Sequence, residues 1–158
     1  MVMIFCTNTI FAQSDSKNNV PGAVITAFAA KYPKAEVKNW AIENDEYTAK
    51  AKGDNGKYFA TFDKNGNWVK TVSKFNWPWH LTPVVRKAFK NSQYGAWHIY
   101  GINIVEKPSG QFYQVMVDDA NHPVDAFHQN VSTQNRLLEF KSDGELVKEK
   151  NTDEIATL

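Results

Sequence analysis

The chain has 158 residues, of which 42% are hydrophobic and 13% aromatic, and this suits one domain or two very small ones with a hydrophobic core. Its 18 basic and 17 acidic residues nearly balance, so neither nucleic-acid binding nor attachment to a membrane through a polybasic face is expected. The single cysteine, Cys6, excludes an internal disulfide and a zinc site built from several cysteines.

The first 18 residues begin with an apolar run and pass abruptly into a polar stretch, which is typical of the end of a signal peptide cut after Ala12. No Lys or Arg precedes Lys17, which a start inside a longer signal peptide would explain. A disordered apolar terminus and a lipoprotein anchor on Cys6 are the alternatives. The run is shorter than the roughly 20 apolar residues that span a bilayer. We expect a truncated signal peptide and polar lead-in over 1–18, a periplasmic or secreted protein, and no membrane insertion.

Two stretches, 20–33 and 81–95, carry apolar residues at helical spacing. Each has a proline near its start, Pro21 and Pro83, where the missing N–H has no intrahelical partner. Thr82 is a plausible N-cap for the second stretch. The sequence therefore predicts one helix at the start of each half of the chain.

Each predicted helix is followed by strand-like segments joined by short turns. Asn65-Gly66 and Asp143-Gly144 are hairpin turn signals, and Asn55-Gly56 is a further one. Alternating residues predict a two-faced sheet: in 47–52 the tyrosine and alanines point to the core and Thr48 and the lysines away from it. The corresponding segments of the two halves are 35–43 with 96–106, 46–51 with 112–117, and 61–70 with 139–148.

We therefore predict an α+β fold, a tandem repeat of helix plus four-stranded antiparallel sheet with the helices packed on one sheet face. The first repeat covers 19–75 and the second 81–150, joined by a linker at 76–80. The second repeat carries an insertion at 118–134, and a tail follows at 151–158. Whether the two sheets join edge to edge stays open.

The linker lies within "KFNWPWHLTP", which places Trp77 and Trp79 on either side of Pro78. Such a cluster is either a binding site or a joint between the two units. Its position between the last strand of the first unit and the second helix favours a joint, in which the buried rings fix the angle between the units.

Five short motifs occur in order along the chain. They are Val-Pro-x-x-Val-x-x-x-Phe at 20–28, Tyr-Pro at 32–33, Val-x-x-Trp at 37–40, Phe-Asp-x-Asn-Gly-x-Trp at 62–68 and Tyr-x-Val-x-Val at 113–117. Together they resemble the PepSY-like, β-lactamase-inhibitor-like family of secreted Bacteroidetes proteins over about residues 19–150. The resemblance implies a helix-plus-four-stranded unit used twice and a secreted, non-catalytic binding or inhibitory role. It does not imply inhibition of a β-lactamase, because a shared fold does not fix function.

No catalytic motif is found in the sequence, and the segment "DKNGNW" at 63–68 is a hairpin turn rather than a calcium loop, because its glycine is at the wrong position. The best metal candidates are Asp118, His122, Asp125 and His128 in the insertion. A solvated polar loop is the preferred interpretation of that segment. We expect no enzyme activity and no cofactor.

The many aromatic residues favour recognition of a protein or peptide, because Trp and Tyr offer large, stiff contact surfaces. We predict a binding module that uses the sheet face without helices, for example to hold or inhibit a peptidase or other envelope enzyme. The alternatives are a small-molecule or metal carrier that uses the insertion, and a structural envelope component. Trp68 is expected to pack in the core. The candidate partner-binding residues are Lys38, Trp40, Lys50, Phe59, Thr61, Trp77, Trp79 and Met116.

Overall fold

The computed structural model describes residues 19–54, 56–119 and 134–152. Two α-helices, one short 3-10 helix and a series of strands alternate along this part of the chain. In order they are α1 (Gly22–Lys31), β1 (Glu36–Glu43), β2 (Glu46–Gly53), β3 (Gly56–Asp63), β4 (Trp68–Phe75), η2 (Pro78–His80), α2 (Pro83–Asn91), β5 (His98–Lys107), β6 (Gly110–Asp118), β7 (Asn135–Lys141) and β8 (Leu146–Asn151).

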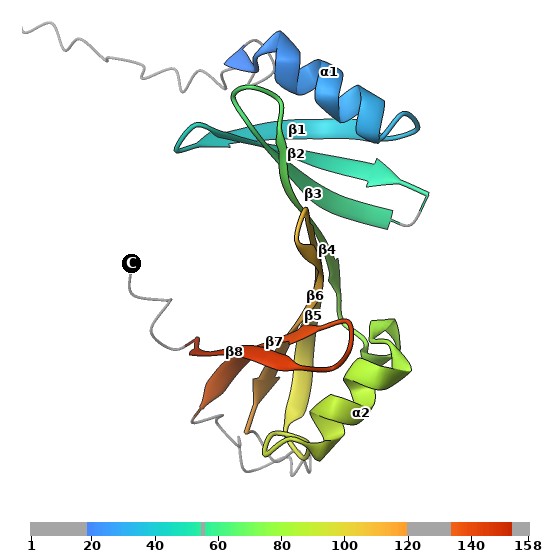
Figure 1. Ribbon diagram of the computed structural model, residues 1–158, viewed down its shortest axis with the longest axis vertical. Helices are drawn as coiled ribbons and strands as arrows, with labels where there is room; N and C mark the ends of the chain where they lie inside the picture. Colours follow the sequence, from blue (N-terminus) through green and yellow to red (C-terminus); the bar gives the residue numbers. More distant parts are fainter. Residues whose placement is uncertain (1–18, 55, 120–133, 153–158) are drawn as a thin grey trace, which may run out of the picture.

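The strands of the described residues form one 8-stranded antiparallel sheet whose strand order follows the chain from β1 to β8 (Figure 1). The predicted α+β tandem repeat of helix plus four-stranded sheet is therefore wrong: the molecule is mostly one sheet with two short helices. Strand β4 pairs with β5, from Thr71 opposite Glu106 to Phe75 opposite Ile102. Two separate sheets would leave the N–H and C=O groups of these strand edges unpaired, and joining the edges satisfies them.

Both α-helices begin where the prolines predict: α1 begins at Gly22, directly after Pro21, and α2 begins at Pro83. The α2 helix is capped by Thr82, whose hydroxyl oxygen accepts a hydrogen bond from the Val85 N–H at 3.3 Å. That confirms the predicted N-cap. Pro21 precedes α1 without a side-chain cap. With 10 and 9 residues, neither of these helices is long and apolar enough to span a bilayer.

The two helices cover the same face of the sheet at its two ends, because each presents an apolar pair one turn apart. Val24 and Phe28 of α1 are buried on one end, and Val85 and Phe89 of α2 on the other. The α1 core also contains Trp40, Ala49, Ala51, Ala60 and Phe62, with Trp68 packed against it. The α2 core contains Leu81, Tyr94, Ile102, Tyr113, Val115, Val117, Leu138 and Phe140.

Hairpin turns press against both helices, and they require glycine. Gly66, in the β3–β4 turn, has a φ of +85°, and a Cβ there would lie 2.7 Å from the backbone oxygen of Ala23 in α1. Gly144, in the β7–β8 turn, has a φ of +90°, and its Cβ would contact the side chains of Val84 and Ala88 in α2. A side chain in this left-handed region is strained. The predicted turns at these glycines are confirmed.

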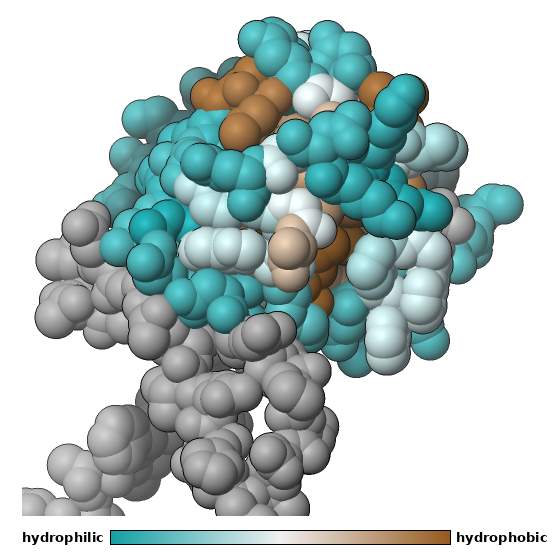
Figure 2. Space-filling model, turned by 90° about the horizontal axis from the view of Figure 1, so that it is seen from below, coloured by the Kyte–Doolittle hydropathy of each residue, from teal (hydrophilic) through white to brown (hydrophobic). Residues whose placement is uncertain are grey.

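The sheet is strongly curved, so that its helix-free face is concave and both helices lie on the outer side (Figure 1). Seen from the α2 end, the surface is mostly hydrophilic, and its hydrophobic side chains form small separate patches (Figure 2). The curvature leaves the helix-free face as the broadest surface that the described helices do not cover.

Candidate functional site

The helix-free side of the sheet, called the open face below, carries a hydrophobic row across its middle. Phe59 is opposite Val72, Val72 is opposite Val105, and Val105 is opposite Phe112 in the strand register. Directly paired residues of antiparallel strands share one face, so these four side chains form a continuous row from β3 to β6. Val105 is buried at the centre, while Phe59 and Phe112 are half-buried.

Lysines surround this hydrophobic row. The register places on the open face Lys50, Lys52, Lys57, Lys70, Lys74, Lys107, Lys141, Lys148 and Lys150. They outnumber the acidic residues of the same face, which are Glu36, Glu43, Glu46, Asp63, Asp118 and Glu139. Among these lysines, and within the described residues, Lys141 alone forms an ion pair, with Glu145 at 2.5 Å. The open face therefore presents a positive potential around a hydrophobic centre.

Two of the lysines lie over the phenylalanine rings at the ends of the row. The Lys74 Nζ is 5.2 Å from the centroid of the Phe59 ring, and the Lys107 Nζ is 4.7 Å from that of Phe112. Both distances are within the range of cation–π contacts. The rings and charges that a partner would contact are thus adjacent on one surface.

The acidic groups nearest the centre of the open face are already engaged. The Glu139 carboxylate accepts a hydrogen bond from the Gln114 amide at 2.7 Å, and Gln114 accepts one from Asn103 at 3.3 Å. The carboxylate of Asp118 lies 3.2 Å from the Nδ1 of His98. These contacts leave the lysine ammonium groups as the charges most available to a binding partner.

Several candidates from the sequence lie on the open face, but not all are accessible. Lys50 is exposed, Phe59 and Met116 are half-buried, and Thr61 is only 2% exposed and hydrogen-bonded to Thr48 at 3.0 Å. Met116 lies over Gly101, where an added Cβ would come within 2.6 Å of its terminal methyl group. Lys50 and Phe59 are the candidates that combine access with a central position.

Trp40 and Lys38 are placed differently. Trp40 is buried on the helix side, 6% exposed, with its ring edge-on to Phe28 at 5.7 Å between centroids. It therefore belongs to the α1 core and does not contribute to the open face. Lys38 occupies a β-bulge in β1, where its ammonium group pairs with Glu36 at 2.6 Å. Trp68 packs against the α1 core, as predicted.

Trp77 and Trp79 are exposed, by 57% and 63%, and their rings stack on each other at 5.0 Å between centroids. The interpretation of this pair as a buried joint is therefore wrong. The connection between β4 and α2 is anchored instead by Leu81, which is 2% exposed, and by the ring of His80, which stacks on Phe75 at 3.9 Å. The tryptophans are left free to contact a partner.

A groove of about 670 Å³ adjoins the tryptophan pair. Trp77, Trp97 and Tyr100 line it, together with His98 at the end of the open face. Tyr100 is 41% exposed. The groove thus connects the exposed tryptophan pair with the end of the open face where β5 begins.

The metal candidates are not assembled in the part of the chain that the structure describes. Asp118 contacts His98, while His122, Asp125 and His128 lie outside the described residues. Within the described ranges, no three His, Cys, Asp or Glu side chains are grouped to hold a metal ion.

Sequence reasoning missed the centre of the open face. Val72, Val105 and Phe112 were not candidates, although Phe112 precedes an alternating segment in which Tyr113, Val115 and Val117 are buried on the other face. The missing signal is the pairing of β4 with β5, which brings Val72 beside Val105. The register between β4 and β5 is not encoded in a local turn, because residues 76–97, which include α2, separate the two strands.

The fold and the site define a small sheet protein whose distinctive surface is a lysine-rich open face. Residues 12–59 and 50–148 match the model of the family described as "Putative beta-lactamase-inhibitor-like, PepSY-like". The chain belongs to this family, as the order of its sequence motifs predicted. No curated protein matches the chain significantly.

Solved structures of Bacteroides proteins share the fold. A DUF2874 family protein from Bacteroides ovatus is similar at 26% identity and a TM-score of 0.72, over 84% of this chain and 87% of that one. A BLIP-like protein from Bacteroides fragilis is 28% identical with a TM-score of 0.70, over 83% and 86% of the two chains. A protein from Bacteroides eggerthii has a TM-score of 0.68 at 17% identity, over 84% and 88%, and is described as periplasmic.

Proposed function

We propose that this protein is a non-catalytic binding module that holds a protein or peptide partner on its open face. The observation that carries the proposal is the hydrophobic row of Phe59, Val72, Val105 and Phe112 within a ring of lysines. Interfaces commonly combine a hydrophobic centre with a polar rim, and aromatic residues dominate their binding energy.

The charge of the open face indicates the chemistry of the partner. Lys50, Lys74 and Lys107 have no ion-pair partner within the described residues, so a surface rich in Asp and Glu would complement them. Charge complementarity speeds association and favours the right partner over others. The expected partner therefore offers apolar side chains for the row and carboxylates for the lysines. An envelope enzyme restrained by such contact fits this description.

Trp77 and Trp79 extend the proposed surface at one end. Their exposure and mutual stacking give a rigid aromatic platform of the kind that is enriched at binding interfaces. Because these exposed rings belong to neither core of the described residues, their removal should affect binding without affecting folding.

The test is recovery of a partner from periplasmic extract by the mature chain and its variants. Lys74→Glu with Lys107→Glu should lower recovery at least tenfold, because it reverses two charges beside the phenylalanines. The matched control, Lys64→Glu with Lys87→Glu, makes the same change of net charge in the β3–β4 turn and on exposed α2. Equal recovery by the two double variants would contradict the use of the open face. Loss with Trp77→Ala and Trp79→Ala at unchanged melting temperature would extend the interface to the platform.

A further inference from the structure

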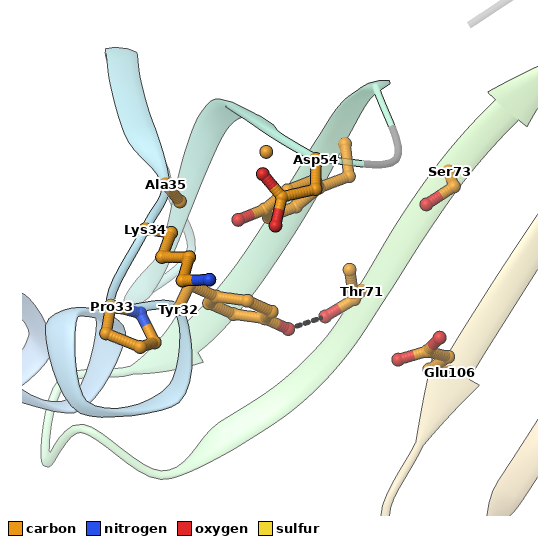
Figure 3. A pocket seen from close by; sticks show the side chains of 10 residues that line it. Tyr32, Pro33, Lys34, Ala35, Asp54, Thr71, Ser73 and Glu106 are labelled. Atoms are coloured by element: carbon orange, nitrogen blue, oxygen red, sulfur yellow. Dashed lines mark hydrogen bonds between the residues drawn. The ribbon is translucent and has the colours of Figure 1, made fainter.

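A pocket of about 330 Å³ opens on the helix side of the sheet, between the α1 core and the α2 core. This volume is at the lower end of the range for small-molecule sites. The pocket lies between the segment that follows α1, the β2–β3 turn and the surfaces of β4 and β5 (Figure 3). It is on the opposite side of the sheet from the open face, so it is independent of the function proposed above.

Two tyrosines form the aromatic wall of this pocket. The rings of Tyr32 and Tyr58 lie 5.0 Å apart between centroids and are inclined by 42°. The hydroxyl groups of Tyr32 and Thr71 share a hydrogen bond, and the Trp68 indole N–H donates to the Thr71 hydroxyl oxygen at 2.9 Å. These hydrogen bonds hold Tyr32 against strand β4, so its ring is already positioned at the pocket.

Two carboxylates and one ammonium group stand around the wall. Glu106 points from β5 toward Thr71 and the pocket, Asp54 extends from the β2–β3 turn, and Lys34 lies on the α1 side (Figure 3). Neither carboxylate forms an ion pair within the described ranges. The three charged residues that line the pocket sum to −1, and Lys31, which does not line it, places its Nζ 5.7 Å from the centroid of the Tyr32 ring. Burial raises the pKa of the Tyr32 phenol, and the negative charge of Glu106 raises it further, so the field of this carboxylate reaches the wall.

We propose that this pocket binds a small organic cation, an ammonium or guanidinium group that packs on the tyrosine rings and pairs with Glu106 and Asp54. The faces of aromatic rings attract cations, and a charge-assisted hydrogen bond to a carboxylate fixes their orientation. The two carboxylates would repel an anion at this position. A hard metal ion needs more oxygen ligands than these two carboxylates supply, and the described residues hold no group of three.

The cation has two sources with the same chemistry. It is either a free amine or guanidine, or the side chain of Lys or Arg in a peptide. The Ser73 hydroxyl and the Lys34 ammonium group also line the pocket, and they would contact a free cation and a peptide side chain in the same way. The experiment therefore has one arm for each source.

The test titrates the full chain with n-butylguanidinium at low ionic strength, with n-butanol as the neutral probe, and follows the tyrosine resonances by NMR. Saturable binding of the cation and none of the alcohol is expected. Glu106→Gln should weaken binding about tenfold, because it removes one charge-assisted contact. Lys34→Gln should strengthen binding several-fold, because it removes a repelling charge, and Ser73→Phe should abolish binding by filling the pocket.

Glu43→Gln, at the exposed end of β1, is the matched control and should bind like the unaltered chain. Thermal unfolding of every variant checks that it is folded. If Ser73→Phe does not fold, the Glu106→Gln variant still tests the proposal, because glutamine has nearly the same size and shape as glutamate. N-acetyl-arginine methylamide supplies the second arm. Binding of both probes assigns a peptide side chain, and binding of butylguanidinium alone assigns a free cation. The proposal would be overturned if neither probe showed saturable binding. It would also be overturned if the Glu106→Gln and Glu43→Gln variants bound butylguanidinium with equal affinity.

Discussion

The two cores under the helices solve the same packing problem with different side chains. Beneath α1 the sheet presents small residues, Ala49, Ala51 and Ala60, and aromatic rings fill the space above them. Beneath α2 the sheet presents branched aliphatic residues, among them Ile102 and Val115. The side chains of the helix and of the sheet together must fill the space between them at native packing density. Small residues on the strands are therefore combined with large rings. The difference teaches that the phenylalanine of α1 packs among other rings, whereas the phenylalanine of α2 packs mainly against aliphatic side chains of the sheet.

Truncation of the central phenylalanines should show this difference most strongly. Phe28 lies 5.2 to 6.2 Å from the rings of Tyr32, Trp40 and Phe62, whereas Phe89 has no ring contact within the described residues. We expect Phe28→Ala to lower the free energy of unfolding by about 5 kcal/mol and Phe89→Ala by about 3 kcal/mol. Urea unfolding followed by circular dichroism measures both.

Leucine at the same two positions is the control, because it keeps most of the volume and removes the ring. Phe89→Leu should be tolerated better than Phe28→Leu. Equal losses for the two leucine variants would contradict the idea that contacts between rings matter more around Phe28 than around Phe89.

The two glycine turns should differ next. Gly66→Ala places its Cβ 2.7 Å from a backbone oxygen, which cannot move aside, whereas Gly144→Ala meets two side chains at 3.1 and 3.2 Å. Both also carry the cost of a positive φ. We expect losses of about 3 kcal/mol for Gly66→Ala and about 1.5 kcal/mol for Gly144→Ala, measured by the same unfolding experiment. The reverse order would show that the α1 end adjusts more easily than its backbone contact indicates.

Loss of the helix cap tests a smaller asymmetry. Thr82 caps α2 with its side chain, and α1 has no such cap at Pro21. Thr82→Ala should lower the free energy of unfolding by about 1 kcal/mol, and Thr82→Ser should largely preserve it. If alanine and serine have the same effect, the hydroxyl does not act as a cap.

The smallest expected effect is on the pH dependence of stability, and it arises in the β3–β4 turn. In the β3–β4 turn the Asp63 carboxylate accepts hydrogen bonds from the Asn67 side chain and from the backbone of Asn65 and Asn67, and these lower its pKa. A lowered folded-state pKa gives stability that is present above the unfolded pKa, near 3.8, and is lost as the pH falls through the folded value. Asp63→Asn should therefore reduce the steepness of acid unfolding. Unfolding profiles between pH 2 and 7 provide the measurement, and coincident profiles would exclude this contribution.

Local elements of the fold were predictable because their signals are local. Prolines at positions 21 and 83 mark the helix starts, and glycines 66 and 144 mark turns that need a positive φ. The joining of β4 to β5 was not predictable, since a strand edge selects its partner through backbone groups that every residue carries. The tandem-repeat prediction is wrong because β4 pairs with β5 to make one sheet, a joining that the sequence left open.

The candidate site was predictable in part for the same reason. Alternation places Lys50 and Phe59 on the side away from the helices, and both remain in the proposed interface. The face of Trp40 could not be predicted, because a large ring suits either face of a strand. In the structure it packs on the helix side, where three small alanines and the helix α1 leave room for the ring. Trp77 and Trp79 remain candidates for partner binding, and only their expected burial in a joint is wrong, since a ring next to a proline does not indicate whether core side chains lie close enough to bury it.

The order of strands in the sheet has a consequence for how the chain folds. Among the described residues, every strand pairs only with its neighbours in the chain, so most contacts close short loops and the entropy lost at each step is small. Sheets with low contact order fold faster than sheets whose strands cross over. We therefore expect hairpins to form first at both ends and the β4–β5 junction, which closes the longer loop through α2, to form last.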